Sequence, residues 1–160
     1  MPSAPFRLLF VCLGNICRSP AAHAVMSSVV EKAGLSAQIE IDSAGTAGWH
    51  MGKLPDDRMR LAGQARGYTL DHAARQIQPA DLAHFDLVLA MDRDNQRNIL
   101  ALDRSQQFTK KVRLFCEFCT EHDAQEVPDP YYGGPEGFEH VLDLIEDSCQ
   151  GILLEAKTRL

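Results

Sequence analysis

The chain has 160 residues, which is enough to bury a proper core and suits one domain over residues 1–160. Its 16 basic and 22 acidic residues give a net charge of −6, which argues against a nucleic-acid or membrane-surface protein, because those proteins need basic clusters. Five cysteines, an odd number, and an opening segment Met1–Arg7 that lacks the pattern of a signal peptide predict a reducing, cytoplasmic location.

The first predicted elements are a strand, a helix and a second strand. A continuous apolar run predicts a strand over 6–11 that is buried on both faces, and the run is too short to cross a bilayer. A helix is expected over 19–33, where apolar residues recur at helical spacing and Gly34 marks the end. Alternating Ile39 and Ile41 predict a strand over 38–42, and a loop over 46–55 follows.

The rest of the chain repeats this alternation. Asp56 or Asp57 is expected to cap a helix that ends near Arg66, and one helical turn is expected over 79–82 after an irregular stretch. Strands are expected over 85–91 and 112–115, with a helix between them that Asp92 caps and that ends near residue 102. The last helix is expected over 136–159, and Gly151 is expected to weaken or bend it.

The alternation of strands and helices predicts an α/β fold. We expect a single domain with a doubly wound, four-stranded parallel sheet flanked by helices. Ligands of such sheets bind beyond the carboxyl ends of the strands. Three loops leave strands at that edge, namely those that begin at Cys12, at Ser43 and after Met91, so a functional site is expected there.

The turn between the first strand and the first helix carries the strongest chemical signal. Gly14 and Asn15 tolerate positive φ, and Ser19 is expected to be the helix N-cap, followed by a proline that starts the helix. A loop that leads from a strand into a helix directs several backbone N–H groups at one point and so forms an anion site. Cys12 and Arg18 stand at the two ends of this loop.

These residue types suit phosphoryl transfer. A thiol attacks only as the thiolate, and the amide dipoles, the helix N-terminus and Arg18 all favour that anion at Cys12. The same donors would bind a phosphate group, with Arg18 holding two of its oxygens. Transfer of the phosphoryl group to sulfur would form a phosphocysteine that water then hydrolyses, with no metal or other cofactor.

The block Val-Cys-Leu-Gly-Asn-Ile-Cys-Arg-Ser-Pro contains Cys-x5-Arg followed by Ser, close to the start of the chain. It resembles the phosphate loop of the low-molecular-weight protein tyrosine phosphatase family. The resemblance covers essentially the whole chain, because further matches lie at Ser43, Trp49, His72, Asp92 and Asp129-Pro130-Tyr131-Tyr132. It implies four parallel strands flanked by helices and the hydrolysis of phosphotyrosine and small aryl phosphates.

Asp129 is the candidate general acid and base. Pro128 and Pro130 stiffen its backbone, and Asp-Pro-Tyr-Tyr-Gly resembles the general-acid loop of the family. Asp129 would protonate the leaving phenolate and later accept a proton from the attacking water. Asp92 is the rival acid, but its position directly after a strand favours a helix N-cap.

The resemblance also implies residues that bind the substrate or support the loop. Ser43 and His72 would hold Asn15, which in turn would hold the loop in a left-handed conformation, and the Ser19 hydroxyl would donate to the Cys12 thiolate. Aromatic rings would form a slot deep enough to select phosphotyrosine over the shorter phosphoserine. The predicted substrate-binding residues are Leu13, Gly14, Asn15, Ile16, Cys17, Ser19, Trp49, Tyr131 and Tyr132.

The other cysteines suggest regulation and packing rather than metal binding. Cys17 faces the same loop as Cys12 and is expected to capture oxidised Cys12 in a reversible disulfide, which predicts redox inactivation. Cys116 and Cys119 have the spacing of zinc ligands but lack a second pair, so we interpret them as partly buried residues at a strand end. Cys149 is interpreted as a packing residue, and no metal site is predicted.

Two further functions stay open beside the leading one. The leading function is a phosphatase that acts on phosphotyrosine-containing proteins, with a tyrosine kinase as one candidate, and works as a monomer or weak homodimer. A thiol-dependent arsenate reductase would need additional cysteines placed to relay a disulfide. A non-catalytic phosphotyrosine-binding module would need neither the Cys12 thiolate nor the Asp129 carboxyl group.

Overall fold

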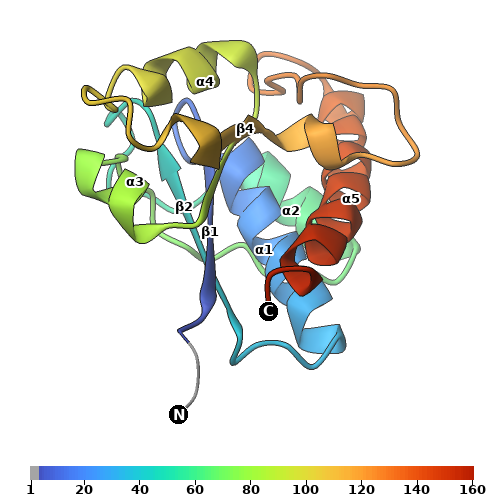
Figure 1. The fold of residues 1–160 in the computed structure, drawn as a ribbon. Helices are drawn as coiled ribbons and strands as arrows, with labels where there is room; N and C mark the ends of the chain where they lie inside the picture. Colours follow the sequence, from blue (N-terminus) through green and yellow to red (C-terminus); the bar gives the residue numbers. More distant parts are fainter. Residues whose placement is uncertain (1–3) are drawn as a thin grey trace.

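The apolar run that begins at Phe6 forms an interior strand of the sheet. The computed structural model describes residues 4–160, and in it β1 (Phe6–Cys12) pairs with β2 (Ile39–Gly45) on one side and with β3 (Leu87–Ala90) on the other. β4 (Val112–Leu114) pairs with β3, so the sheet has the order β2-β1-β3-β4 and its strands are all parallel (Figure 1). The predicted four-stranded parallel α/β fold is confirmed.

Helices cover both faces of this sheet (Figure 1). One face carries α1 (Arg18–Lys32), α2 (Asp57–Ala65) and α5 (Pro135–Lys157), and the other carries α3 (Pro79–His84) and α4 (Arg93–Leu100). Successive side chains of β1 point to opposite faces, so Leu8 and Phe10 join the first layer whereas Leu9 and Val11 join the second. This two-sided burial explains why the strand has no polar alternation.

The predicted elements are present, but several of their ends differ. Asp56 caps α2 and Asp92 caps α4, each by accepting a backbone N–H, as predicted. β2 continues to Gly45 and α3 to His84, beyond the predicted 38–42 and 79–82, whereas β3 is shorter than the predicted 85–91. Two short 3-10 helices, η1 (Thr109–Lys111) and η2 (Phe115–Phe118), flank β4.

The predicted cap of the first helix is wrong. α1 begins at Arg18, and Cys17 occupies the N-cap position without a capping side-chain hydrogen bond. The Ser19 hydroxyl instead contacts Asn15 and Cys12, so it serves the turn that precedes the helix. A capping propensity is a local preference, and these tertiary hydrogen bonds override it.

No helix within residues 4–160 is both long and apolar enough to cross a membrane. Met1, Pro2 and Ser3, which begin the segment predicted not to be a signal peptide, lie outside the described residues.

Gly151 permits a close contact between α5 and the backbone of η2. The helix continues through this position from Pro135 to Lys157. A Cβ atom on Gly151 would lie 1.9 Å from the carbonyl oxygen of Phe118 in η2, a distance at which the backbone has to move. The glycine therefore lets the last helix pack directly on the segment that follows the sheet.

Replacing Gly151 tests this contact. Gly151→Ala is expected to lower the free energy of unfolding by about 2–3 kcal/mol, because the η2 backbone has to shift to admit the methyl group. Gly137→Ala is the matched control in the same helix, since its Cβ would meet Pro130 Cβ at an ordinary 3.7 Å. Urea denaturation should show a neutral or slightly stabilising effect for Gly137→Ala, and equal losses in the two variants would contradict the close-contact explanation.

Candidate active site

Three strands end together at one edge of the sheet, and the residues that follow them form a cavity. Cys12 at the end of β1 stands opposite Gly45 at the end of β2, and Val11 stands opposite Ala90 at the end of β3. The turn 13–17 then leads directly into α1. Cys12 and the turn that follows it therefore lie at the carboxyl edge of the sheet, where the site was predicted.

The turn after β1 holds its carbonyl oxygens outward. The Cys12 oxygen accepts the Thr46 N–H at 2.9 Å, and the Leu13 oxygen accepts the Ala47 N–H at 2.9 Å. The Ile16 oxygen accepts the N–H of Asp56, which lies farther along the chain, at 2.8 Å. Because these oxygens bond to neighbouring segments, the N–H groups of the turn are left for its inner side.

The inner side of the turn surrounds a sulfur atom. The Asn15 N–H donates to Cys12 Sγ at 3.3 Å. Within residues 4–160, the N–H groups of Gly14 and Ile16 donate to no protein acceptor. Such a ring of unpaired donors at the start of a helix favours an anion at its centre.

Two glycines allow neighbouring segments to press against this turn. A Cβ on Gly45 would lie 2.8 Å from the Leu13 carbonyl oxygen. A Cβ on Gly14 would lie 2.9 Å from the His50 ring. Both distances are shorter than real Cβ contacts, so larger residues would push the loop after β2 away from the turn.

Asn15 locks the conformation of the turn. Its φ of 57° is left-handed, a region that asparagine tolerates better than most residues. Its side-chain oxygen accepts the Arg75 N–H at 3.0 Å, which directs its Nδ2 to Ser19 Oγ at 2.7 Å and Ser43 Oγ at 3.1 Å. Ser19 Oγ therefore accepts from Asn15, and its own proton has two acceptors, Cys12 Sγ at 3.0 Å and the more distant Ala44 carbonyl oxygen at 3.4 Å.

Arg18 is buried and partly committed to other contacts. Its Nη1 donates to Asp92 Oδ2 at 2.6 Å and to the Val127 carbonyl oxygen at 2.9 Å. These two bonds use both Nη1 protons and leave the Nε and Nη2 protons, which share one edge of the guanidinium, for an anion. Burial alone would lower the pKa of Arg18, but the negative groups around it, Cys12 and Asp92 foremost, raise its pKa above the ordinary value.

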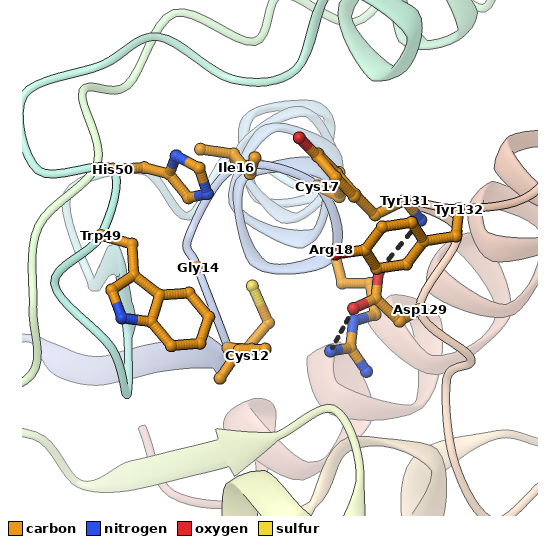
Figure 2. A pocket seen from close by; sticks show the side chains of 11 residues that line it. Cys12, Gly14, Ile16, Cys17, Arg18, Trp49, His50, Asp129, Tyr131 and Tyr132 are labelled. Atoms are coloured by element: carbon orange, nitrogen blue, oxygen red, sulfur yellow. Dashed lines mark hydrogen bonds and ion pairs between the residues drawn. The ribbon is translucent and has the colours of Figure 1, made fainter.

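The Cys12 sulfur opens into a cavity of about 240 Å³. Figure 2 shows the sulfur pointing into the space between Trp49 on one side and Asp129 with the tyrosines on the other. Trp49 is 71% exposed and Tyr132 is 94% exposed, so both belong to the rim rather than to the floor. The residues that line the cavity are Cys12, Leu13, Gly14, Ile16, Cys17, Arg18, Trp49, His50, Asp129, Tyr131 and Tyr132.

Asp129 faces the cavity across from the sulfur. Its Oδ1 accepts the Tyr131 N–H at 3.0 Å, and its Oδ2 lies 3.8 Å from Arg18 Nη2. Its side chain is 41% exposed, so it can reach both a bound ligand and solvent. The Tyr131 ring beside it stacks against the Arg58 guanidinium, 5.3 Å from the ring centroid.

His72 does not lie where the resemblance implied. Within residues 4–160 it makes no hydrogen bond with Asn15; its Nε2 lies 3.2 Å from Asp42 Oδ1, and its ring centroid lies 4.6 Å from that of His23. Asp42 raises the pKa of His72, whereas burial and the neighbouring His72 ring lower the pKa of His23 to about 4. His23 Nδ1 lies 3.2 Å from Ser43 Oγ, and a backbone hydrogen bond with Ser43 also raises the pKa of His72, so His72 is linked to Asn15 through Ser43.

The cysteines divide into two groups. Cys17 is buried and lines the cavity together with Cys12. Burial, with Asp56 and Cys12 nearby, raises the pKa of Cys17 far above its ordinary value, so Cys17 is a neutral thiol. Cys116, in η2, and Cys149, in α5, are buried in the core and do not line this cavity.

The comparisons with known proteins settle the family. The model of the family described as low molecular weight phosphotyrosine protein phosphatase matches residues 7–159. The chain belongs to this family. Its relatives are named protein-tyrosine phosphatases, which are hydrolases, so the predicted family and activity are confirmed.

Relatives from distant organisms match over nearly their whole length. A Synechocystis protein that carries the family name is 54% identical over 147 residues, which is 92% of this chain and 94% of its own. A human low molecular weight phosphotyrosine protein phosphatase is 38% identical over 152 residues, which is 93% of this chain and 94% of its own. A crystal structure of a protein tyrosine phosphatase from Entamoeba histolytica, with Hepes in its active site, has a TM-score of 0.92 and 45% identity, and covers 96% of this chain and 97% of that one.

Two residues of the site were not predicted from the sequence. His50 lines the cavity and packs on Gly14. Arg75 holds the Asn15 side chain through its backbone N–H and binds Asp42 through its guanidinium. His50 is next to Trp49 and shares its loop, which is a signal that could have indicated it, whereas a contact made by a backbone N–H leaves no signal in residue type.

The left-handed Asn15 yields a test that separates backbone strain from side-chain bonding. Asn15→Ala and Asn15→Gly both lose the hydrogen bonds to Ser19, Ser43 and Arg75, so both should be less stable than the unmodified protein. Glycine alone adopts the φ of 57° without strain, so Asn15→Gly should unfold at higher urea than Asn15→Ala, by about 1 kcal/mol. A more stable alanine variant would show that the left-handed conformation is not a constraint.

Proposed function

We propose that this protein is a protein-tyrosine phosphatase that hydrolyses phosphotyrosine and small aryl phosphates through a phosphocysteine on Cys12. The proposal is carried by one observation, the convergence of the Cys12 sulfur, the Arg18 guanidinium and the Asp129 carboxyl group on one cavity of about 240 Å³. A nucleophile, an anion-binding group and a proton donor are the parts that ester hydrolysis needs.

In the first step the phosphoryl group moves from tyrosine to sulfur. The Cys12 thiolate attacks phosphorus, and the bond from phosphorus to the phenolic oxygen breaks as the sulfur–phosphorus bond forms. The free edge of Arg18 and the N–H groups of the turn hold the three other phosphate oxygens. Asp129 gives its proton to the departing phenolic oxygen, so that tyrosine leaves as a neutral phenol.

In the second step water releases phosphate. Asp129 takes a proton from the water as its oxygen attacks phosphorus, and the sulfur–phosphorus bond breaks. The departing sulfur receives a hydrogen bond from the Ser19 hydroxyl, which lies 3.0 Å from Cys12 Sγ. The Asn15 amide keeps that hydroxyl oriented, because it occupies the Ser19 oxygen as an acceptor. Inorganic phosphate and free Cys12 are the products.

The rim of the cavity supports phosphotyrosine as the substrate. Trp49, Tyr131 and Tyr132 border its mouth, well outside the buried sulfur of Cys12. An aryl ring fills the slot between these rings while its phosphorus reaches the sulfur, whereas the short side chain of phosphoserine would not reach. The similar Entamoeba structure holds Hepes in its active site, and the tetrahedral sulfonate of Hepes supports the binding of a tetrahedral oxyanion at this place.

Family membership supports phosphoproteins as the substrates. Within that class the proposal names phosphotyrosine-containing proteins, a tyrosine kinase among them, as partners of a monomer or weak homodimer. It also includes one catalytic domain over residues 1–160, which the family match over 7–159 supports. A cytoplasmic location completes the proposal, because a reducing compartment keeps Cys12 in its reactive thiol form.

The two other functions have less support. A disulfide relay for arsenate reduction would need further thiols beside the pair Cys12 and Cys17, but Cys116 and Cys119 do not line the cavity. A binding module would need neither a thiolate nor an acid, yet Asp129 lies opposite the sulfur in the same cavity as Cys12.

Hydrolysis of p-nitrophenyl phosphate at mildly acidic pH tests the assignment. Cys12→Ser is expected to lose at least about 10³-fold in kcat, because an alcohol cannot replace the thiolate in this site. Asp129→Ala is expected to lose about 10²–10⁴-fold with poor leaving groups and much less with good ones, because only poor leaving groups need a proton. An added chelator should leave the activity of the unmodified protein unchanged.

Asp123→Ala serves as the control for Asp129→Ala, since Asp123 is an exposed carboxylate on the same segment between η2 and α5. It should retain full activity. Full activity of Cys12→Ser, or loss of activity in chelator, would overturn the proposed mechanism.

The thiol pair in the cavity tests redox control. Peroxide would convert the Cys12 thiolate to a sulfenic acid with release of water, and the Cys17 thiol would then displace a second water to form a disulfide that external thiols reduce. Cys17→Ser should therefore keep its starting activity but fail to recover after peroxide and a reducing thiol, whereas the unmodified protein recovers. Equal recovery in the two proteins would count against protection by Cys17.

A further inference from the structure

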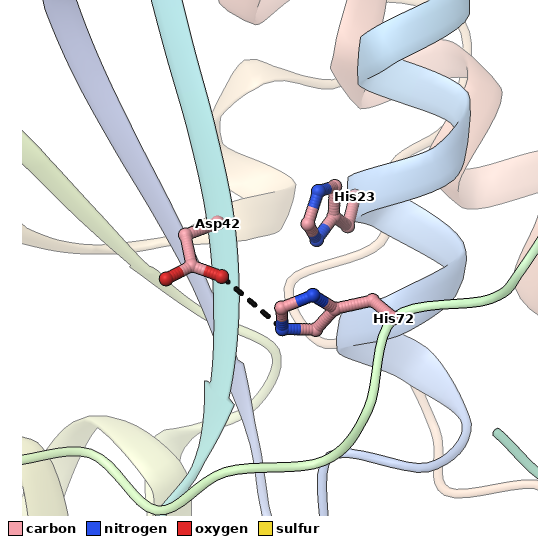
Figure 3. Close-up of side chains that lie close together, drawn as sticks. All are labelled: His23, Asp42 and His72. Atoms are coloured by element: carbon pink, nitrogen blue, oxygen red, sulfur yellow. Dashed lines mark ion pairs between the residues drawn. The ribbon is translucent and has the colours of Figure 1, made fainter. Parts of the chain in front are cut away.

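A second group of reactive side chains lies beneath the turn, outside the catalytic cavity. His23 of α1, Asp42 of β2 and His72 of the segment between α2 and α3 each offer one ligand atom, and these atoms all lie within 4.8 Å of one another. Figure 3 shows the two imidazole rings and the carboxylate directed toward a common point from three different parts of the chain. None of the three lines the catalytic cavity.

One ring nitrogen in this group faces a carboxylate. His72 Nε2 is inaccessible to solvent and lies 3.2 Å from Asp42 Oδ1, the distance of an ion pair. Within residues 4–160, its N–H is not aligned with that oxygen as in a regular hydrogen bond. An imidazole nitrogen and a carboxylate oxygen this close are near enough for both to bind one metal ion.

We propose that His23, Asp42 and His72 bind a divalent transition-metal ion, with zinc as the best fit. Two imidazoles and one carboxylate are the ligand set that zinc takes in sites that keep water as the fourth ligand, whereas magnesium and calcium prefer oxygen ligands alone. Tetrahedral zinc with ligands at about 2.0–2.2 Å requires ligand atoms about 3.3 Å apart. The His72–Asp42 distance of 3.2 Å already meets this requirement, and the other ligand atoms, within 4.8 Å, would have to move closer as the ion binds.

Outer contacts hold these ligands in position. Asp42 Oδ1 accepts the Ser43 N–H at 2.8 Å, while Arg75 Nε donates to the other carboxylate oxygen at 3.1 Å, which leaves Oδ1 as the ligand oxygen. His23 Nδ1 lies 3.2 Å from Ser43 Oγ. Hydrogen bonds of this kind orient metal-binding histidines and carboxylates in known sites.

The surface offers a path to this point. A cavity of about 300 Å³, distinct from the catalytic one, opens beside α1 and includes His23 and His72 in its wall. Its other lining groups include Ser27, Glu31 and Asp71, so it is polar and suits a hydrated cation. The ion would approach through this cavity and not through the mouth that the substrate uses.

The site also touches the machinery of the turn. Ser43 contacts both His23 and Asn15, so an ion held by His23 lies two contacts away from the residue that fixes the turn. Inhibition of the phosphatase by zinc is not a test, because the Cys12 thiolate is itself a zinc ligand. Binding has to be measured where that sulfur is absent.

The experiment uses the full chain with Cys12→Ser and zinc alone as the probe. Isothermal titration should give one bound zinc per chain, and the melting temperature should rise by about 5–10 °C at a zinc concentration about 100 times the dissociation constant. Adding His23→Gln should weaken zinc binding at least tenfold. His140→Gln, an exposed histidine on α5, is the matched control and should bind zinc as before.

Cobalt provides an independent readout. Bound Co²⁺ should show visible d–d bands without the near-ultraviolet sulfur charge transfer that cysteine ligands give, and proton NMR should show that the ring signals of His23 and His72 respond most. Should His23→Gln reduce folding, Asp42→Asn makes the same comparison from β2. Absence of zinc binding, unchanged affinity in both ligand variants, or a sulfur band would overturn the proposal, and none of these results depends on phosphatase activity.

Discussion

The structure depends on a short turn in which the carbonyl oxygens of Cys12, Leu13 and Ile16 bond to neighbouring segments. Thr46 and Ala47 bind the first two of these oxygens, and Asn15 keeps the chain in a left-handed conformation between them and the helix. A peptide group cannot turn its oxygen outward without turning its N–H inward. The anion site therefore exists before any anion arrives, because the loop after β2 and the Asn15 side chain have already oriented the donors.

Arg18 extends the same constraint to the rest of the site. One of its terminal nitrogens is saturated by Asp92 after β3 and by the Val127 carbonyl oxygen before the acid loop. These two contacts tie three separate chain segments to one guanidinium and set the direction of its remaining edge. The bond to Asp92 also explains how one carboxylate serves two purposes, since its second oxygen caps α4 through the Asn95 N–H. Asp92, predicted to be a helix cap or a rival acid, therefore caps α4 and also positions Arg18.

Local signals explain what could be predicted from the sequence. Apolar runs without alternation indicate strands buried on both sides, and the turn was recognisable because its glycine, asparagine, cysteine and arginine each have a separate physical reason to be there. The cap of α1 could not be predicted in this way, because the Ser19 hydroxyl has equally good partners in Asn15 and Cys12. The position of His72 is likewise decided by Asp42 and His23, which lie 30 and 49 residues away along the chain.

The hydrogen bonds that support the catalytic turn also reach the group formed by His23, Asp42 and His72. The buried Ser43 hydroxyl contacts both Asn15 and His23. The hydrogen bonds of the turn therefore continue to the His23 imidazole, which borders a separate cavity. Asn15 Nδ2 donates to the Ser43 hydroxyl, so the hydroxyl proton is available to His23 Nδ1 only when that ring nitrogen carries no proton of its own. Whatever occupies that ring, a proton or a metal ion, therefore bears on the orientation of Asn15, and through Ser19 on the sulfur that begins the reaction. The catalytic turn and the second cavity are therefore joined by one hydrogen-bond chain through Ser43, although different residues line the two cavities.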